Sequence, residues 1–147
     1  MAKNVVVDAG PIVAWLNAED ARHEWAKAQF ARLYPPLLTC EPVITEVSFL
    51  VRRAGADAAA AVSLVEKGVL RVPISVQEQA AHLAALMRRY RQVPMSLADA
   101  CLVRLCELLD DPVVMTLDAD FRIYRRRGRQ VIPVMAPEGI YTQRHNL

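Results

Sequence analysis

The sequence predicts an α/β protein: a three-layer α/β/α domain with a mainly parallel central sheet of four or five strands. Short apolar runs of strand length recur along the chain, at Val5–Val7, Leu37–Cys40, Val69–Ile74, Val113–Leu117 and Val131–Val134. Longer stretches with helical character separate these runs. Strands that alternate with helices are typical of parallel sheets, because a helix supplies the crossover between parallel strands. The first run is uninterrupted valine, as is common in parallel strands buried on both faces.

The predicted helices are bounded by residues that favour helix termini. Gly10-Pro11 is interpreted as a turn that leads into a first helix. Pro42 is suited to a first helical turn. Ser75 and Ser96 each stand three residues before an acid, which is the spacing of a capping box. The later helices are therefore expected at residues 20–33, 42–53, 55–67, 75–91 and 96–109.

The chain is expected to form one domain over residues 1–147. Its 147 residues suffice to bury roughly 70% of the unfolded surface, and 54% hydrophobic with 23% charged residues is typical of a globular protein. No apolar run approaches the ~20 residues of a membrane span, and the chain opens directly on the first predicted strand. We therefore expect a cytoplasmic protein without membrane association.

The number and spacing of the cysteines indicate whether the chain carries disulfides, a zinc site or free thiols. Three cysteines without C-x-x-C spacing predict buried reduced thiols rather than disulfides or a zinc site.

Two arginine clusters contain no acid, and they hold eight of the 18 basic residues. Such clusters favour contacts with a polyanion, although a solvated helix surface would have the same composition. The clusters are Arg88, Arg89 and Arg91, and Arg122, Arg125, Arg126, Arg127 and Arg129.

Acids follow two of the predicted strands. Asp8 ends the valine run, and Asp118 and Asp120 follow the strand expected at Val113–Leu117. Ligands of open α/β sheets bind at the carboxyl ends of the strands. The alternative is that Asp8 and Asp118 only cap the helices that follow them.

Two further acids are predicted to lie on apolar helix surfaces. Asp99 shares a helical stripe with Leu102, Val103 and Cys106. A carboxylate there must be paired, hydrogen-bonded or metal-bound, because its desolvation is costly. A capping box with Ser96 explains Asp99 equally well.

Glu46 is predicted to lie in line with Val43, Phe49 and Leu50, on the apolar side of its helix. A single site explains Asp8, Glu46, Asp99 and Asp118 together. Carboxylates that converge repel one another unless a cation neutralises them, and oxygen ligands favour Mg²⁺ or Mn²⁺. The three histidines do not accompany these acids, which argues against zinc.

Four motifs resemble those of PIN-domain ribonucleases, in particular the toxin subunits of VapBC-type toxin–antitoxin pairs. In order along the chain they are VVVDAGPIVAWLN, LLTCEPVITEVSFLVRR, PMSLADACLVRL and VMTLDADFRIYRR. Asp8, Glu46, Asp99 and Asp118 match the four acids of the family. Thr116 matches the threonine before the last acid, and Asp120 is an auxiliary candidate. Ala9 departs from the pattern, because many relatives carry a small hydroxyl or amide residue at this position.

The resemblance implies a Mg²⁺- or Mn²⁺-dependent endoribonuclease that is the toxin of a type II toxin–antitoxin system. Asp8, Glu46, Asp99 and Asp118 would be the catalytic and metal-binding residues, with Asp120 as a further candidate ligand. Asp8, Asp99 and Asp118 would lie at or near the metal, and Glu46 would hold it directly or through water. Thr116 would support them. The expected partners are an RNA substrate, a small antitoxin and a second copy of the chain. The predicted RNA-binding residues are Arg122, Arg125, Arg126 and Arg127.

Two other functions remain open at this stage. The domain could be a non-catalytic interaction module with vestigial acids, although all four acids are present. It could also be a phospho-acceptor receiver-like domain, which needs a lysine near the phosphate. The lysines are Lys3, Lys27 and Lys67, and none of them ends a late strand.

Overall fold

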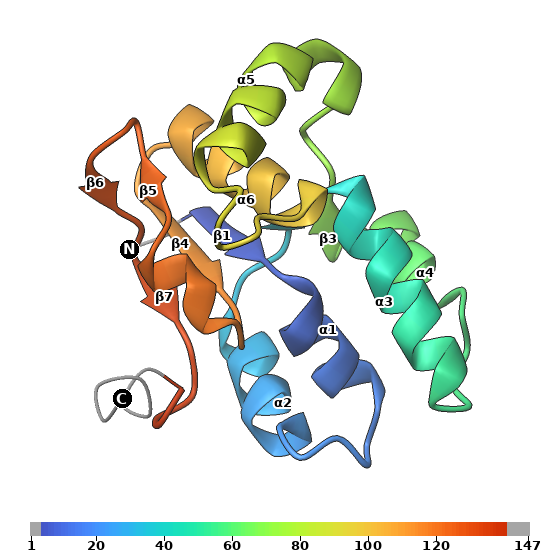
Figure 1. Cartoon of the computed structure of the whole chain (residues 1–147). Coiled ribbons are helices and arrows are strands. Elements are labelled where there is room, and N and C mark those ends of the chain that lie inside the picture. Colours follow the sequence, from blue (N-terminus) through green and yellow to red (C-terminus); the bar gives the residue numbers. More distant parts are fainter. Residues whose placement is uncertain (1–3, 141–147) are drawn as a thin grey trace.

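The computed structural model describes residues 4–140, and it contains a parallel five-stranded sheet flanked by helices (Figure 1). The strand order is β3-β2-β1-β4-β7, and every neighbouring pair is parallel. The predicted fold class is therefore confirmed. The strands are β1 (Asn4–Val7), β2 (Leu37–Leu38), β3 (Leu70–Arg71), β4 (Pro112–Met115) and β7 (Val134–Met135).

Six α-helices connect the strands, and none of those in residues 4–140 is long and apolar enough to cross a membrane. The expected helical regions are confirmed, with shorter bounds at most ends. A 3-10 helix, η1 (Ala119–Arg122), follows β4. The α-helices are α1 (Ala9–Leu16), α2 (His23–Arg32), α3 (Glu41–Arg53), α4 (Ala60–Glu66), α5 (Val76–Arg89) and α6 (Leu97–Leu108).

The turn predicted at Gly10-Pro11 is wrong, because both residues lie in the first turn of α1. Proline is tolerated there, since the first backbone N–H groups of a helix have no partner within the helix. A Cβ on Gly10 would stand 3.1 Å from Cγ of Leu117. Glycine therefore lets the start of α1 lie directly against the chain that leaves β4.

The single strand predicted at Val131–Val134 is also wrong, because these residues belong to two different strands. Its first residue belongs to β6 (Gln130–Val131), which forms an antiparallel hairpin with β5 (Arg125–Arg126). Its last residue begins β7, the fifth strand of the main sheet. Pro133 separates the two, and proline has no N–H to donate to a strand ladder. Two consecutive residues with positive φ, Arg127 (51°) and Gly128 (84°), form the hairpin turn.

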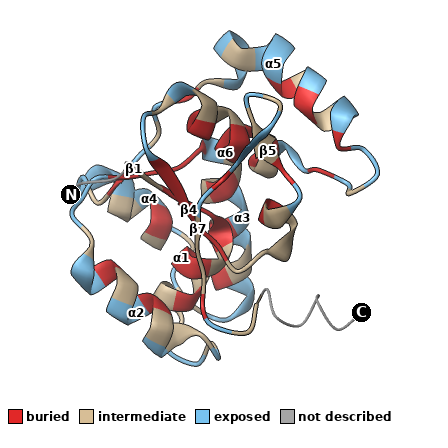
Figure 2. Ribbon diagram, turned by 90° about the vertical axis from the view of Figure 1, so that its left-hand side faces the viewer, coloured by how far each residue is buried: buried red, intermediate tan, exposed pale blue. Residues whose placement is uncertain are grey.

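The core surrounds strands β1 and β4 and most of the circumference of α6 (Figure 2). The register pairs Val5 with Val113 and Val7 with Met115, so β1 and β4 end at the same level. The residues that follow, Asp8 and Thr116, therefore lie side by side at the carboxyl edge of the sheet. The three cysteines are buried free thiols, as predicted.

Candidate active site

A pocket of about 650 Å³ lies at the carboxyl edge of the sheet, and all four predicted acids line it. Asp8 follows β1, Asp118 follows β4, Glu46 comes from α3 and Asp99 comes from the first turn of α6. Four separate elements thus bring their acids to one place. The lining residues are Asp8, Ala9, Gly10, Glu46, Ser96, Asp99, Leu117 and Asp118.

The hydroxyl of Thr116 joins the two acids at the strand ends. It donates to Oδ2 of Asp8 at 2.7 Å and accepts a hydrogen bond from the backbone N–H of Asp118 at 2.8 Å. The other oxygen of Asp8 accepts from the N–H of Ala9 at 2.8 Å, so Asp8 also caps α1. The carboxylate of Asp8 therefore caps the helix and also lines the pocket, and its role in binding a ligand stays a prediction.

Burial raises the pKa of Asp8 from 3.8 to about 6. The side chain is 8% exposed, and desolvation penalises its charged form. Hydrogen bonds from Thr116 and Ala9 oppose this shift, and the charges of Asp99 and Asp118 add to it. The pocket therefore disfavours the charged form of Asp8 when no cation is present.

Asp99 both caps α6 and lines the pocket, and these are the two positions that the sequence left open for it. It forms the capping box of α6: its N–H donates to Oγ of Ser96 at 3.0 Å, and its Oδ2 accepts from the N–H of Ser96 at 3.3 Å. The same Oδ2 accepts a hydrogen bond from the hydroxyl of Tyr124 at 3.0 Å. The side chain is half-buried and lines the pocket.

Sequence reasoning missed Tyr124. The side chain is fully buried between Tyr90 and Phe121, both of which it meets edge-on. Burial, and next the charge of Asp99, raise the pKa of Tyr124, so the hydroxyl stays protonated and donates to Asp99. A lone tyrosine among arginines gives little sign of such a role in the sequence.

The apolar position predicted for Glu46 is wrong. The buried side chains of α3 are Val43, Val47 and Val51, whereas Glu46 is exposed and Phe49 is 59% exposed. Glu46 nevertheless lines the pocket. Partial desolvation raises its pKa, as do the charges of Asp99 and Asp118.

Asp118 caps η1, because its Oδ1 accepts the N–H of Asp120 at 2.9 Å. Asp118 therefore caps η1 and also lines the pocket, and its role in binding a metal stays a prediction. Asp120 is half-buried and is not among the residues that line the pocket. Its role as a metal ligand stays a prediction.

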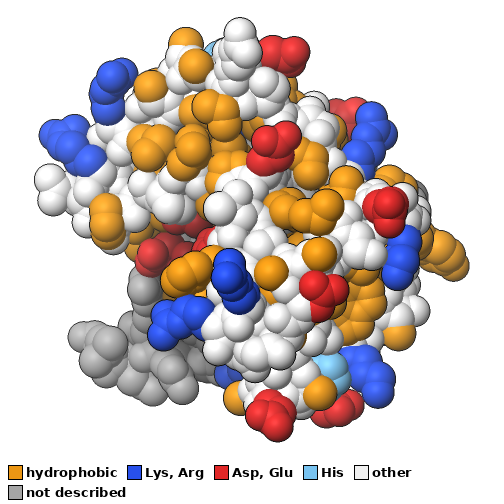
Figure 3. All heavy atoms as spheres, turned by 90° about the vertical axis from the view of Figure 1, so that its right-hand side faces the viewer, with side chains coloured by type: hydrophobic (Ala, Val, Ile, Leu, Met, Phe, Trp, Pro, Cys, Tyr) orange, Lys and Arg blue, Asp and Glu red, His pale blue; other side chains and the backbone are white. Residues whose placement is uncertain are grey.

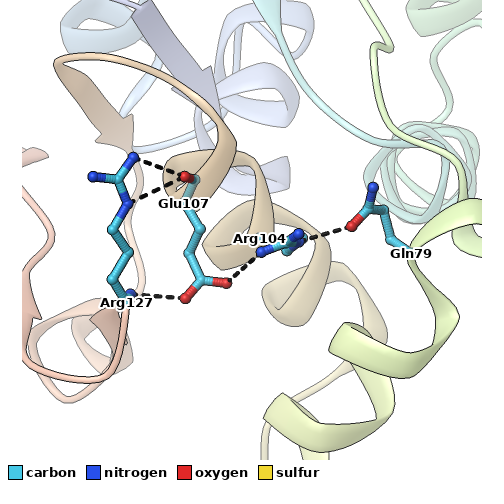
Figure 4. Close-up of polar contacts among 4 residues, drawn as sticks. All are labelled: Gln79, Arg104, Glu107 and Arg127. Atoms are coloured by element: carbon cyan, nitrogen blue, oxygen red, sulfur yellow. Dashed lines mark hydrogen bonds and ion pairs between the residues drawn. The ribbon is translucent and has the colours of Figure 1, made fainter.

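The arginines predicted to bind RNA lie in η1 and in the β5–β6 hairpin, and three of them bond to main-chain carbonyls. Arg125 donates to the carbonyls of residues 122, 123 and 124. Arg126 donates to the carbonyl of Leu109 at 2.9 Å, and Arg127 donates to that of Glu107 at 3.0 Å (Figure 4). These bonds hold the hairpin against the end of α6. The RNA-binding role of Arg122, Arg125, Arg126 and Arg127 stays a prediction.

The donor chemistry of the pocket fits a hard divalent cation. Every titratable side chain in its lining is a carboxylate, and carboxylate oxygens favour Mg²⁺ or Mn²⁺. Within residues 4–140, no group of three histidine, cysteine, aspartate or glutamate side chains could hold a metal ion as it stands. Mutual repulsion keeps carboxylates apart when no cation is present, so metal binding requires side-chain rotations that draw them together.

A parallel sheet with acids gathered at its carboxyl edge is the arrangement of a PIN domain. The family model of the PIN domain matches residues 5–127, and the chain belongs to this family.

The structure is similar to that of VapC20 from Mycobacterium tuberculosis, described as a Sarcin-Ricin loop cleaving toxin. The TM-score is 0.68 and the sequence identity 25%, over 75% of this chain and 86% of VapC20. No curated protein sequence matches the chain significantly.

Proposed function

We propose that the chain is a Mg²⁺- or Mn²⁺-dependent endoribonuclease that acts as the toxin of a type II toxin–antitoxin system. The observation that carries this proposal is the meeting of Asp8, Glu46, Asp99 and Asp118 in one pocket. Membership of the PIN family and the likeness to VapC20, an RNA-cleaving toxin, support it. The reaction is hydrolysis of an RNA phosphodiester bond.

Asp8, Asp99 and Asp118 are the residues that would hold the metal. A bound divalent cation supplies two effects, a lower pKa of a water molecule and neutralisation of charge on the phosphate. Thr116 and Tyr124 each bond to one carboxylate oxygen and so restrict its rotation. Ionised carboxylate oxygens accept more than one contact, so these bonds leave room for a ligand.

Glu46 is suited to accept a proton. It is exposed, and no other side chain in residues 4–140 hydrogen-bonds to it. Partial desolvation, and next the charges of Asp99 and Asp118, raise its pKa, which makes it a stronger base than an ordinary surface glutamate. In this proposal Glu46 acts on water at the mouth of the pocket, and the more buried acids hold the metal.

A small antitoxin and a second copy of the chain are the proposed protein partners, and RNA is the proposed substrate. The likeness to a toxin supports the antitoxin. The competing function of a non-catalytic interaction module predicts the same fold without cleavage. A receiver-like domain is disfavoured by the match to the PIN family.

Cleavage of a single-stranded RNA with Mn²⁺, with Mg²⁺ and with EDTA tests the proposal. We expect cleavage with either metal, none with EDTA and none by Asp99→Asn. Glu78→Gln is the matched control, because Glu78 holds the same position in the first turn of α5, after Ser75, but lies outside the pocket. This control should cleave at the wild-type rate.

Circular dichroism of each variant checks that the fold is retained. Full activity of Asp99→Asn, or cleavage that persists in EDTA, would contradict the proposed mechanism. Absence of cleavage by the wild type with either metal, while a candidate antitoxin still binds, would favour the interaction module.

A further inference from the structure

Two arginine clusters that are far apart in the sequence meet in the fold. The hairpin turn packs against the C-terminal end of α5, where Nη2 of Arg89 donates to the carbonyl of Gly128 at 2.7 Å. The hydroxyl of Tyr90, which follows α5, accepts a hydrogen bond from the N–H of Arg125 at 3.0 Å. The end of α5 and the hairpin therefore form one continuous region.

Some arginines in this region anchor the structure. Arg89 bonds to Gly128 and also lies over the ring of Tyr90, at 5.1 Å from its centroid. Arg127 bonds to the carbonyl of Glu107 through its guanidinium and to the Glu107 carboxylate through its backbone N–H (Figure 4). The other carboxylate oxygen of Glu107 pairs with Arg104 at 3.3 Å. Glu107, the acid that bonds to the hairpin, is therefore already engaged.

Three other arginines of the region are turned to solvent. Arg88, Arg91 and Arg129 are exposed, and within residues 4–140 none of them forms an ion pair. One nitrogen of Arg91 donates to the carbonyl of Arg88 at 3.1 Å, and the remaining donors of Arg91 have no partner there. We call Arg88, Arg91 and Arg129 the arginine surface. Its positive charge is not compensated by neighbouring carboxylates.

A chain of side-chain contacts links the region of the arginine surface to Asp99 of the acidic pocket. Tyr124 bonds to Asp99 at 3.0 Å, and the ring of Tyr124 meets the ring of Tyr90 edge-on at 5.1 Å between centroids. Tyr90 in turn directly precedes Arg91 and bonds to the hairpin. Two packed aromatic rings thus separate an acid of the site from the region that carries the arginine surface.

We propose that the arginine surface binds the phosphates of the RNA strand next to the bond that is cleaved. The inference rests on the proposed nuclease function and assigns part of its substrate contact to residues outside the pocket. Guanidinium groups form strong charge-assisted bonds to phosphate, and such contacts position a nucleic acid without reading its sequence. An acidic segment of a protein partner is the alternative ligand. RNA is favoured because two packed aromatic rings connect the region of this surface to Asp99 of the pocket.

The test measures binding of a fluorescent single-stranded RNA in EDTA, so that cleavage does not interfere. Binding is followed from about 50 to 200 mM salt for the wild type and for the combined variant R88A/R91A/R129A. Each lost phosphate contact on a single strand lowers the slope of log K against log salt by about 0.7, so loss of all three lowers it by about 2. R88K/R91K/R129K, which keeps the charge, should retain most of the slope.

The matched control is R32A/K67A/R71A, which removes three exposed cations from α2, from the end of α4 and from β3. Both combined variants lower the net charge from +2 to −1. The control should keep the wild-type slope. A wild-type slope for R88A/R91A/R129A, or equal losses in the two variants, would overturn the proposal.

A separate cleavage assay with Mn²⁺ distinguishes this inference from the proposed function. Wild-type cleavage with an unchanged salt slope in R88A/R91A/R129A would refute the arginine surface alone. No cleavage by the wild type would refute the nuclease itself. Weaker binding of a candidate antitoxin to R88A/R91A/R129A, with an unchanged slope for RNA, would assign the surface to a protein partner.

Discussion

The two sides of the pocket hold their acids in different ways. On the strand side, Asp8 is 8% exposed and bonds to Thr116 and Ala9. On the α3 side, Glu46 is exposed, and nothing in residues 4–140 hydrogen-bonds to it. On the face of the molecule drawn in Figure 3, exposed acidic side chains lie beside hydrophobic ones. In the proposed mechanism the hydrogen-bonded acids at the strand ends would hold the cation, and the exposed Glu46 would act on water.

The largest expected effect is on the rate of RNA cleavage. Variants of Asp8 and Glu46 compare the strand side and the α3 side of the pocket directly. Asp8→Asn should reduce cleavage to the level measured in EDTA, because it removes a charged oxygen ligand from the fixed side of the pocket. Glu46→Gln should lower the rate but leave the affinity for Mn²⁺ nearly unchanged. Initial rates over a range of Mn²⁺ concentrations measure both effects.

Glu66→Gln is the control for Glu46→Gln, because Glu66 is an exposed helix glutamate outside the pocket. It should behave as the wild type. A larger loss of metal affinity in Glu46→Gln than in Asp8→Asn would reverse the comparison.

The next effect is the pH dependence of stability without metal. The pKa of Asp8 is about 6 in the folded chain against an ordinary 3.8, so between these values the folded state holds a proton that the unfolded state has lost. Asp8 therefore contributes stability below pH 3.8 that is lost as pH rises to about 6. The loss amounts to about 3 kcal/mol, on the order of 1.4 kcal/mol per pKa unit.

Urea unfolding in EDTA at several pH values measures this loss as the difference between the wild type and Asp8→Asn. At neutral pH the variant should be the more stable of the two, although it no longer cleaves RNA. Added Mn²⁺ should stabilise the wild type by about 2.7 kcal/mol at a hundredfold excess over its Kd, and Asp8→Asn by less. If Asp8 acted only as a helix cap, Asp8→Asn would leave stability nearly unchanged at every pH and with Mn²⁺, because asparagine caps a helix about as well as aspartate.

The smallest of the three effects concerns Thr116, which keeps the strand side rigid. Thr116→Val removes the bond to Asp8 and the acceptor for the N–H of Asp118. Partners of this kind typically contribute about 10–100-fold to metal affinity or activity. Thr116→Ser keeps the hydroxyl and should retain most of the activity. Equal activity of the serine and valine variants would mean that the hydroxyl does not position the acids.

Much of the sheet could be predicted from the sequence. Val6 and Val7 of β1 and both valines of β4 are buried, and buried parallel strands have a distinctive continuous apolar pattern. The β5–β6 hairpin could not be predicted this way. Its strands are two residues each, rich in arginine, and they are held by contacts with Glu107 and Leu109 that come from elsewhere in the chain. Tertiary contacts, and not local apolar pattern, determine that segment.

All four acids of the pocket could be predicted from the sequence, but the arguments for them are not equally sound. Asp8 and Asp118 were inferred from strand ends, and parallel register places such residues together. Glu46 was inferred from a helical stripe that includes Phe49, yet Phe49 is exposed. The stripe placed Glu46 on the wrong surface of α3, although the residue does line the pocket. Tyr124 was missed because its bond to Asp99 spans 25 positions and follows no periodic pattern.

The bond between Thr116 and Asp8 joins residues that are 108 positions apart, which has a consequence for biosynthesis. A ribosome adds about 5–20 residues per second, so the two halves of the site emerge about 5 to 20 s apart. Until β4 has emerged, β1 lacks the neighbour that pairs with all four of its residues. We therefore expect a nascent or prematurely terminated chain to be harmless to the RNA around it. The proposed nuclease site can therefore form only after β4 and Thr116 have been translated.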